Sequence, residues 1–272
     1  MVMSLVMEKT VNPSASLGVI IPTMPGREKS FKESFESALE CRAHEIVIVT
    51  PNPNILKNLI SKHSEVRVLQ DSGVGAAAAI NIGLRVLESS FGAWIGDDDK
   101  LIKDGIIESL ARLQMNDLII ATYGQVFYNS DSRRVLYKPG LSAERTPGRL
   151  INKVAQPGSV FRRLDSGKFM ELNENLKFAF DEQLFVDLRR FGNLSYIEQP
   201  VAEYLWHAGS LSAGQRKEAI REAVALRWKN ASLGKKAIYS LPWMLMLIDA
   251  ELPSRTFARR QTKKSWQINE IP

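Results

Sequence analysis

Short apolar runs, rich in β-branched residues, recur along the first hundred residues. They are LGVIIP (17–22), EIVIVT (45–50), VRVLQ (66–70) and GAWIG (92–96). Each run stays largely apolar instead of alternating with polar residues, and this pattern is typical of parallel strands that are buried on both faces. The four runs therefore predict the core of a parallel sheet.

The segments between these runs have apolar residues at helical spacing. Phe31, Phe35 and Ala38 would share one face of a helix after the first run, and we expect a second helix over 55–62. An alanine-rich helix follows the glycine-rich turn that begins at Asp71. Strands that alternate with helices and short loops predict an α/β fold with a doubly wound, mostly parallel sheet flanked by helices.

The second half of the chain is less regular. Strand-like patterns cover residues 117–129, 134–140, 157–163 and 194–207. A helix is expected over 180–192, with Gly192 as its stop, and another over 213–233, followed by an apolar and basic tail. We therefore expect a leader over 1–16, one α/β domain over 17–212 and a helical, basic C-terminal appendage over 213–272.

Three polar loops follow strands of the predicted sheet. They are TMPGRE (23–28), DSGVG (71–75) and the cluster of Asp97, Asp98 and Asp99. Right-handed crossovers place all strand carboxyl ends at one edge, where open α/β sheets bind ligands. Clustered carboxylates suit Mg²⁺ or Mn²⁺, and such an ion would neutralise a departing diphosphate. The alternative is an ordinary polar loop or helix cap.

Three further features allow two interpretations each. Residues 71–84 predict a glycine-rich turn followed by a helix, and the N-terminus of this helix could bind a phosphate. The alternative is an ordinary tight turn between a strand and a helix. Asp181 could be a general base for a hydroxyl nucleophile, or a favourable acid in a first helical turn. His207 could bind a metal or phosphate, or be an ordinary surface histidine.

Composition excludes several classes of protein. The chain of 272 residues has a net charge of +6, one cysteine and three histidines. This cysteine and histidine content cannot build the usual zinc-containing nucleic-acid modules, and we expect no nucleic-acid partner. Residues 1–16 lack the pattern of a secretory signal, and no apolar run reaches the roughly 18 residues needed to span a membrane. We therefore expect a cytoplasmic protein.

The apolar stretch AIYSLPWMLMLI (237–248) has basic neighbours on both sides. It includes Trp243, a residue type enriched at membrane interfaces, and Lys235 and Lys236 precede it. One interpretation is peripheral contact with the cytoplasmic membrane face through residues 235–264. The alternative is that Trp243, Met244 and Leu247 pack on the catalytic domain or on a second subunit, as in a homodimer, and that the basic tail is solvated.

The order of the motifs resembles the family 2 glycosyltransferases, which have the nucleotide-binding GT-A fold. The matching segments are VIIPTMPGRE, DSGVGAAAAINIGL, GAWIGDDDKL, PGSVFRR, FDEQLFVDLRRFG and YLWHAGSLS. They cover roughly residues 17–212 in the family's order, with a donor-binding half over 17–100 and an acceptor half over 101–212. The resemblance implies an inverting transfer from a nucleotide sugar to a glycan or lipid-linked acceptor, assisted by Mn²⁺ or Mg²⁺.

The resemblance also implies roles for individual residues. On the donor side it points to Pro22, Thr23, Arg27, Glu28, Asp71, Gly73, Asn81, Gly83, Asp97 and Asp98. Asp99 matches the direct metal ligand, and His207 matches a histidine that closes over the metal and diphosphate. Asp181 matches the catalytic base.

Two segments depart from the family pattern. The second strand ends in VTPNPN, with Thr50 and Asn52 where the family commonly has acids that contact the base. Gln183 and Asp187 stand where the acidic helix usually has an acid and an arginine. Two other functions remain open: a nucleotidyltransferase that makes the activated sugar, and a non-catalytic module that binds nucleotide sugars.

Overall fold

The computed structural model describes residues 16–56, 62–130, 133–139, 154–206 and 215–251. Nine strands in this part of the chain form one sheet with the order β3-β2-β1-β4-β8-β6-β9-β5, and β7 pairs with β6. The expected leader, except Ser16, lies outside the described residues.

The first half of the chain forms the parallel side of the sheet. Its elements are β1 (Leu17–Pro22), α1 (Glu28–Glu40), β2 (Glu45–Thr50), η1 (Pro53–Leu56), β3 (Val66–Gln70), α3 (Ala76–Val86), β4 (Phe91–Trp94) and β5 (Lys100–Leu101). β1 pairs in parallel with β2 and β4, and β2 pairs in parallel with β3, so the four predicted strands are confirmed. Of the helix expected over 55–62, residues 57–61 lie outside the described part.

The second half adds mixed pairing. Its elements are α4 (Lys103–Met115), β6 (Ile119–Ser130), β7 (Arg133–Tyr137), β8 (Val160–Arg162), α5 (Phe180–Leu188) and β9 (Asn193–Leu205). β8 is antiparallel to both β4 and β6, whereas β9 is parallel to β6. β9 continues through Pro200 because the register shifts there, and such a bulge accommodates a residue without an N–H. The helix α4 was not predicted from sequence.

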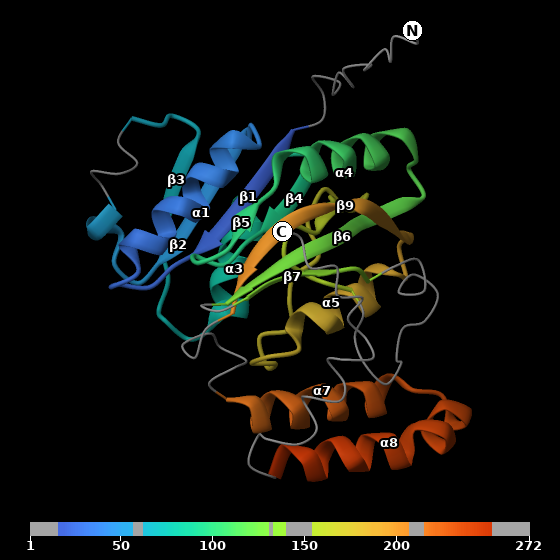
Figure 1. The fold of residues 1–272 in the computed structure, drawn as a ribbon. Coiled ribbons are helices and arrows are strands. Elements are labelled where there is room, and N and C mark those ends of the chain that lie inside the picture. The colour runs from blue at the N-terminus through green and yellow to red at the C-terminus, as the bar shows by residue number, and fades with distance from the viewer. Residues whose placement is uncertain (1–15, 57–61, 131–132, 140–153, 207–214, 252–272) are drawn as a thin grey trace, which may run out of the picture.

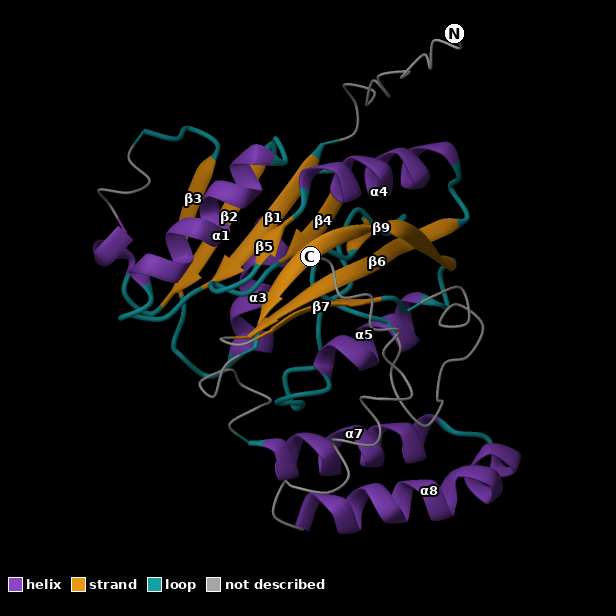
Figure 2. Cartoon of the chain, viewed as in Figure 1, coloured by secondary structure: helices purple, strands orange, loops and turns teal. Residues whose placement is uncertain are grey.

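The sheet is covered by helices on both faces (Figures 1 and 2). Val19 of β1 belongs to the apolar cluster that includes α1 and α4, and the adjacent Ile20 belongs to the cluster that includes α3 and α5. Successive residues of a strand face opposite sides, which explains why these strands are apolar throughout. The observed fold is therefore the layered α/β sheet that the sequence predicts.

The C-terminal helices pair with each other beside α5 (Figure 1). They are α7 (Arg216–Asn230) and α8 (Leu233–Glu251), and α8 includes Pro242. Pro242 removes the helical partner of the Ile238 carbonyl, but Ile238 is 68% exposed, so water can hydrate that oxygen. The single helix expected over 213–233 is thus shorter, and the apolar part of the tail is a second helix.

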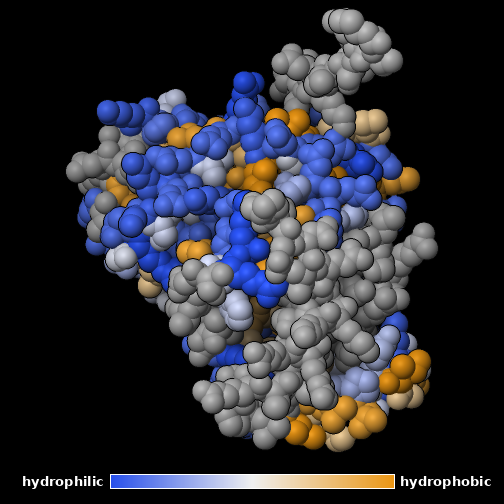
Figure 3. All heavy atoms as spheres, viewed as in Figure 1, coloured by the Kyte–Doolittle hydropathy of each residue, from blue (hydrophilic) through white to orange (hydrophobic). Residues whose placement is uncertain are grey.

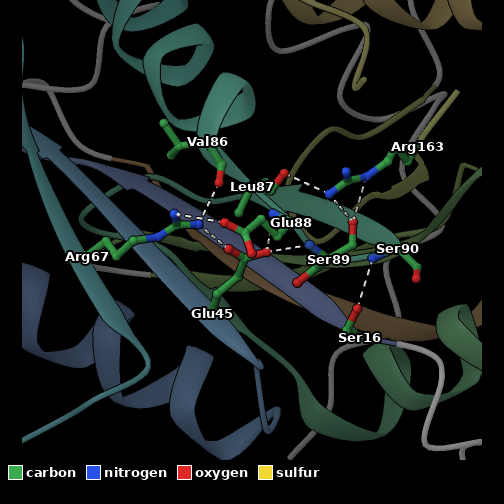
Figure 4. Close-up of polar contacts among 9 residues, drawn as sticks. All are labelled: Ser16, Glu45, Arg67, Val86, Leu87, Glu88, Ser89, Ser90 and Arg163. Atoms are coloured by element: carbon green, nitrogen blue, oxygen red, sulfur yellow. Dashed lines mark hydrogen bonds and ion pairs between the residues drawn. The ribbon is translucent and has the colours of Figure 1, made fainter. Parts of the chain in front are cut away.

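A polar network holds the amino ends of the strands, as Figure 4 shows. Glu45, at the start of β2, accepts hydrogen bonds from the backbone N–H groups of Glu88 (2.7 Å) and Ser89 (2.5 Å) and pairs with Arg67. Arg163 donates to the carbonyl of Ser89 at 3.1 Å. These contacts fix the connection from α3 to β4 at the edge opposite the strand carboxyl ends.

The close packing of α4 on β9 predicts a specific loss of stability. A Cβ atom on Gly105 would lie 2.1 Å from the backbone oxygen of Pro200, whereas one on Gly234 in α8 would have nothing within 4 Å. We expect Gly105→Ala to reduce the free energy of unfolding by about 1–3 kcal/mol, because the backbone of β9 has to move. We expect Gly234→Ala to be neutral or slightly stabilising. Urea unfolding of both variants tests this, and equal effects would contradict the packing.

Candidate functional site

The end of β4 meets the loop after β1 through the side chain of Asp97. Asp97 is 5% exposed, and its Oδ2 accepts a hydrogen bond from Thr23 Oγ1 at 2.8 Å. Its Oδ1 accepts one from Arg27 Nη1 at 2.7 Å. Because β1 and β4 are neighbours in the sheet, their loops leave the same edge together. The structure thus brings together three residues that the sequence assigns to the donor side.

The next two acids increase the negative charge at this edge. Arg27 Nη1 also lies 3.3 Å from Asp98 Oδ2. Asp99 is 5% exposed, and its Oδ1 accepts a hydrogen bond from the backbone N–H of Leu205 at 2.9 Å. Burial, together with repulsion from Asp98 and Asp97, raises the pKa of Asp99 to about 8. The surroundings of Asp99 therefore favour an added positive charge.

The donor set at this edge fits a hard divalent cation. Within the residues that the structure describes, no three His, Cys, Asp or Glu side chains converge as a ready-made metal centre. Mg²⁺-type ions are commonly held by one or two carboxylates, with water and phosphate oxygens completing the shell. The carboxyl oxygens of Asp99, which are buried and have no cationic side chain paired with them among the described residues, suit such a site. His207, its predicted companion, lies outside the described residues.

The glycine-rich turn before α3 lies at the end of β3, next to β2. Gly73 and Gly75 have φ angles of 69° and 153°, which favour glycine. The backbone N–H of Asp71 donates to the carbonyl of Thr50 at 3.2 Å, which ties the turn to the end of β2. Asp71 Oδ1 is buried and has no hydrogen-bond partner among the described residues. A ligand that donates a hydrogen bond would satisfy this oxygen.

Asn81 and Gly83 of α3 have roles in packing. Asn81 is 1% exposed; its Nδ2 donates to the carbonyl of Leu172 at 2.9 Å, and its Oδ1 accepts from the N–H of Leu172 at 2.7 Å. A Cβ atom on Gly83 would lie 2.7 Å from the side chain of Ile20. These contacts hold α3 against β1 and the segment at Leu172. A donor-binding role for Asn81 remains a prediction from the resemblance alone.

The remaining predicted residues of the first loop have local contacts. Pro22 ends β1 and is paired with Val49 of β2. The exposed Glu28 begins α1, and its Oε1 accepts a hydrogen bond from the N–H of Gly26 at 3.0 Å. Glu28 therefore stabilises the turn that carries Arg27, and any contact with a donor remains a prediction.

Asp181 lies in the first turn of α5. Its Oδ1 accepts a hydrogen bond from the backbone N–H of Glu182 at 2.7 Å. Burial raises the pKa of Asp181 to about 6; the charge of Glu182 also raises it, and Arg227 opposes the shift. A carboxylate whose pKa lies near neutrality is matched to general-base catalysis.

Tyr128 of β6 packs against Tyr137 and Tyr204. Burial is the main cause of its raised pKa, followed by Tyr137 and Tyr204 and then by the charges of Asp181 and Asp99. The charges of acids from both halves of the chain thus act on one phenol group. Sequence analysis did not single out Tyr128, because nothing in a buried strand distinguishes an aromatic residue beside a site from one in the core.

Glu182 and Arg227 form a buried ion pair that the sequence did not predict. Arg227 Nε and Nη2 donate to the two carboxylate oxygens of Glu182, each at 2.8 Å. The residues are 9% and 6% exposed. Paired geometry of this kind is among the stronger side-chain interactions. It joins the helix that carries Asp181 to the C-terminal helix α7.

Comparison with known proteins adds evidence on the fold. No family model and no curated protein matches the chain. S. aureus TarS 1–349 in complex with UDP-GlcNAc matches with 16% identity and a TM-score of 0.60, over 92% of this chain and 73% of that chain. The mannosyltransferase PcManGT from Pyrobaculum calidifontis, in complex with GDP-Man and Mn²⁺, matches with 14% identity and a TM-score of 0.61, over 86% and 72%.

The chain has a GT-A-like glycosyltransferase fold. The fold predicted from the order of the sequence motifs is therefore confirmed. Sequence identities of 14–16% establish the fold alone. The activity has to be inferred from the chemistry of the site.

Proposed function

We propose that this glycosyltransferase fold carries out inverting, metal-assisted hexosyl transfer of the family 2 type. The donor is a nucleotide sugar, and the acceptor is a hydroxyl group of a glycan or lipid-linked sugar in polysaccharide synthesis. The observation that carries the proposal is the cluster of buried acids at the end of β4, where Thr23 and Arg27 bind Asp97 and the equally buried Asp99 accepts the N–H of Leu205. Complexes of the two similar proteins with UDP-GlcNAc and GDP-Man support a nucleotide-sugar donor.

The loops after β1 and β3 hold the donor in this proposal. Thr23 and Arg27 hold the buried side chain of Asp97 in place, which shapes the edge on the β1 side. The unsatisfied oxygen of Asp71 accepts a hydrogen bond from the nucleoside part of the donor. Gly73 leaves room for the close approach of that group, because its left-handed turn carries no side chain.

Asp99 would hold the divalent cation, Mn²⁺ or Mg²⁺, and His207, which lies outside the described residues, would be the second protein ligand. When bound, the cation neutralises the negative charge that develops on the nucleoside diphosphate as it departs. The protein contributes by fixing Asp99 through the N–H of Leu205, and a bound cation would displace the proton that the raised pKa of Asp99 favours. The Mn²⁺ in the complex of PcManGT supports this assignment.

Asp181 is the general base. It takes the proton from the acceptor hydroxyl as the oxygen forms a bond to the anomeric carbon, and the bond from that carbon to the nucleoside diphosphate breaks with inversion. The backbone N–H of Glu182 fixes one carboxylate oxygen of Asp181. The two oxygens of Glu182 are both bound by Arg227, so Asp181 is the better candidate for the base.

The products released from nucleotide sugars distinguish this function from its alternatives. We expect release of a nucleoside diphosphate when the protein is incubated with a panel of nucleotide sugars, Mn²⁺ and glycan acceptors. Pyrophosphate release from a sugar phosphate and a nucleoside triphosphate would indicate a nucleotidyltransferase instead. Donor binding without either product would indicate a non-catalytic binding module.

Replacement of the metal ligand should abolish turnover without loss of the fold. Asp99→Asn keeps the shape of the side chain and removes its charge, and we expect turnover to fall by at least roughly 100-fold. Asp104→Asn, on the exposed first turn of α4, is the matched control and should retain the parent rate. An Asp99→Asn protein that works at the parent rate in excess chelator would refute the metal assignment.

Replacement of the base should lower kcat and remove one limb of the pH profile. We expect Asp181→Asn to reduce kcat by about 10²–10⁴-fold, with donor affinity little changed. In the parent protein kcat should rise with pH through about 6 as Asp181 loses its proton. Asp187→Asn on the same helix should behave like the parent. Loss of donor binding with an unchanged kcat would move Asp181 out of the catalytic role.

The outer face of α8 is apolar and has no partner among the described residues. Ile238, Leu241, Met244, Leu245 and Ile248 are each 46–68% exposed, and their spacing places them on one side of the helix. Figure 3 shows apolar residues gathered at the bottom of the view, where α8 lies. Trp243, by contrast, is 1% exposed and packs against Trp228 of α7, within the C-terminal pair of helices.

The charge beside this face favours an anionic membrane over a second copy of the chain. Lys229, Lys235 and Lys236 lie at the junction of α7 and α8, and five Arg or Lys residues follow between 255 and 264. Each such charge near an anionic surface contributes about 1 kcal/mol. No helix of the described residues could cross a bilayer. We therefore propose peripheral contact at the cytoplasmic membrane face through residues 235–264.

Vesicle binding tests the membrane surface. We expect co-sedimentation with phosphatidylglycerol vesicles at low salt, weaker binding at high salt, and at least a tenfold loss in Leu241→Glu/Leu245→Glu. Met115→Glu/Leu118→Glu adds the same charge at exposed apolar positions by α4 and should bind like the parent. No binding at low salt would contradict the proposal. A parent dimer that the first variant converts to monomer would identify a homodimer interface.

A further inference from the structure

The helix that carries Asp181 begins without a cap of its own. α5 starts at Phe180, and its N-cap residue Ala179 has no side chain that could accept a hydrogen bond from the first turn. The first N–H groups of a helix have no helical acceptor and need partners from elsewhere. In this structure a residue of α7 binds the three N–H groups that immediately precede the helix, up to that of the N-cap residue Ala179.

Glu222 of α7 binds the segment that leads into α5. Its Oε1 accepts hydrogen bonds from the N–H groups of Phe178 (2.6 Å) and Ala179 (2.7 Å), and its Oε2 accepts one from Lys177 (2.8 Å). Three N–H groups on one carboxylate fix the direction in which the chain enters the helix. A negative charge at this position also complements the positive end of the helix dipole.

α7 also holds the first turn of α5 from the other side of Asp181. Arg227 binds both oxygens of Glu182, and Asn230 Nδ2 lies 3.3 Å from Gln183 Oε1. The residues on both sides of Asp181 are thus fixed by one helix, which lies beside α5 in Figure 1. The hydrogen bond that Asp181 accepts comes from its own helix, so the contacts with α7 act on its backbone.

We propose that Glu222 and Arg227 are positioning residues for Asp181, so that α7 is a working part of the active site. This inference rests on the proposed role of Asp181 as the base. Fixing the start of α5 on both sides holds the carboxylate at the place where it meets the acceptor hydroxyl. The expected C-terminal appendage would then be required for turnover.

The ion pair also balances the charge around the base. Among the described residues, the titratable groups that act on Asp181 are Glu182 of its own helix, Arg227 of α7 and Tyr128 of β6. The negative charge of Glu182 favours the protonated form of Asp181, and the positive charge of Arg227 favours the deprotonated form. Removal of Arg227 should therefore shift the acid limb of the kcat–pH profile to higher pH, and removal of the charge of Glu182 should shift it to lower pH.

A pair of single variants measures this directly. We expect Arg227→Met to move the acid limb of the kcat–pH profile up by about one unit and Glu182→Gln to move it down by a similar amount. Arg221→Gln is the matched control, because Arg221 belongs to the same helix but pairs with Glu251 of α8. It should leave the limb and kcat unchanged. Donor KM should stay within about twofold throughout.

Removal of the cap tests the positioning of the helix start. Glu222→Gln has one acceptor oxygen in place of two and turns an amide N–H toward backbone N–H groups. We expect kcat to fall at least about tenfold, with donor KM unchanged, because the donor site lies in the other half of the chain. Circular dichroism and the melting temperature show whether each variant is folded.

If a single variant fails to fold, a double variant that removes both charges of the buried pair can still test the inference. Glu182→Leu/Arg227→Met replaces the buried pair with apolar side chains, which is commonly tolerated. It should retain donor binding and lose kcat. Parent-like kcat in this variant, or shifts of the acid limb in the same direction in both single variants, would overturn the inference. No turnover by the parent protein would instead refute the proposed function.

Discussion

Buried negative charge at the carboxyl end of β4 is the constraint on which the site depends. Asp97 is neutralised where it lies, because Thr23 and Arg27 from the loop after β1 bind its two oxygens. Asp99 is equally buried but receives only backbone hydrogen bonds in the described structure, and its pKa rises accordingly. A folded protein keeps such a group only where a bound cation or a proton compensates for it. The arrangement therefore favours the binding of a cation together with an anionic ligand.

The opposite side of the site depends on a second buried charge, that of Glu182. Its pair with Arg227 joins α7 to the first turn of α5. Glu222, also of α7, binds the segment that precedes this turn. Loss of one partner from a buried pair typically costs about 3–5 kcal/mol, so this contact is also important for folding. The stability of the C-terminal helices and the position of Asp181, the proposed base, are consequently linked.

Local patterns in the sequence predicted most of the sheet and its ligand edge. The β-branched runs identified β1 to β4, and their order placed Thr23, Arg27 and Asp97 close together, as the structure confirms. Contacts between distant residues left no such pattern. The pair of Glu182 and Arg227 spans 45 positions, and neither residue differs in sequence from a charge on a solvated helix.

Two other features could not be predicted because tertiary packing decides them. Asn81 has a polar side chain that could bind a ligand, yet its amide group is hydrogen-bonded to the backbone of Leu172. Trp243 and Leu241 belong to the same apolar run, but the pairing of α7 with α8 buries the first and exposes the second.

The most direct test of the account is a thermal-shift measurement with nucleotide sugars in the presence and absence of Mn²⁺. At about 100 times the dissociation constant, a ligand stabilises the folded state by roughly 2.7 kcal/mol, which gives a clear increase in Tm. We expect this increase for at least one nucleotide sugar with Mn²⁺ and a smaller increase without the ion. In Asp99→Asn we expect only the smaller increase, whether or not Mn²⁺ is present. The absence of any increase across the panel at millimolar donor and Mn²⁺ would contradict it.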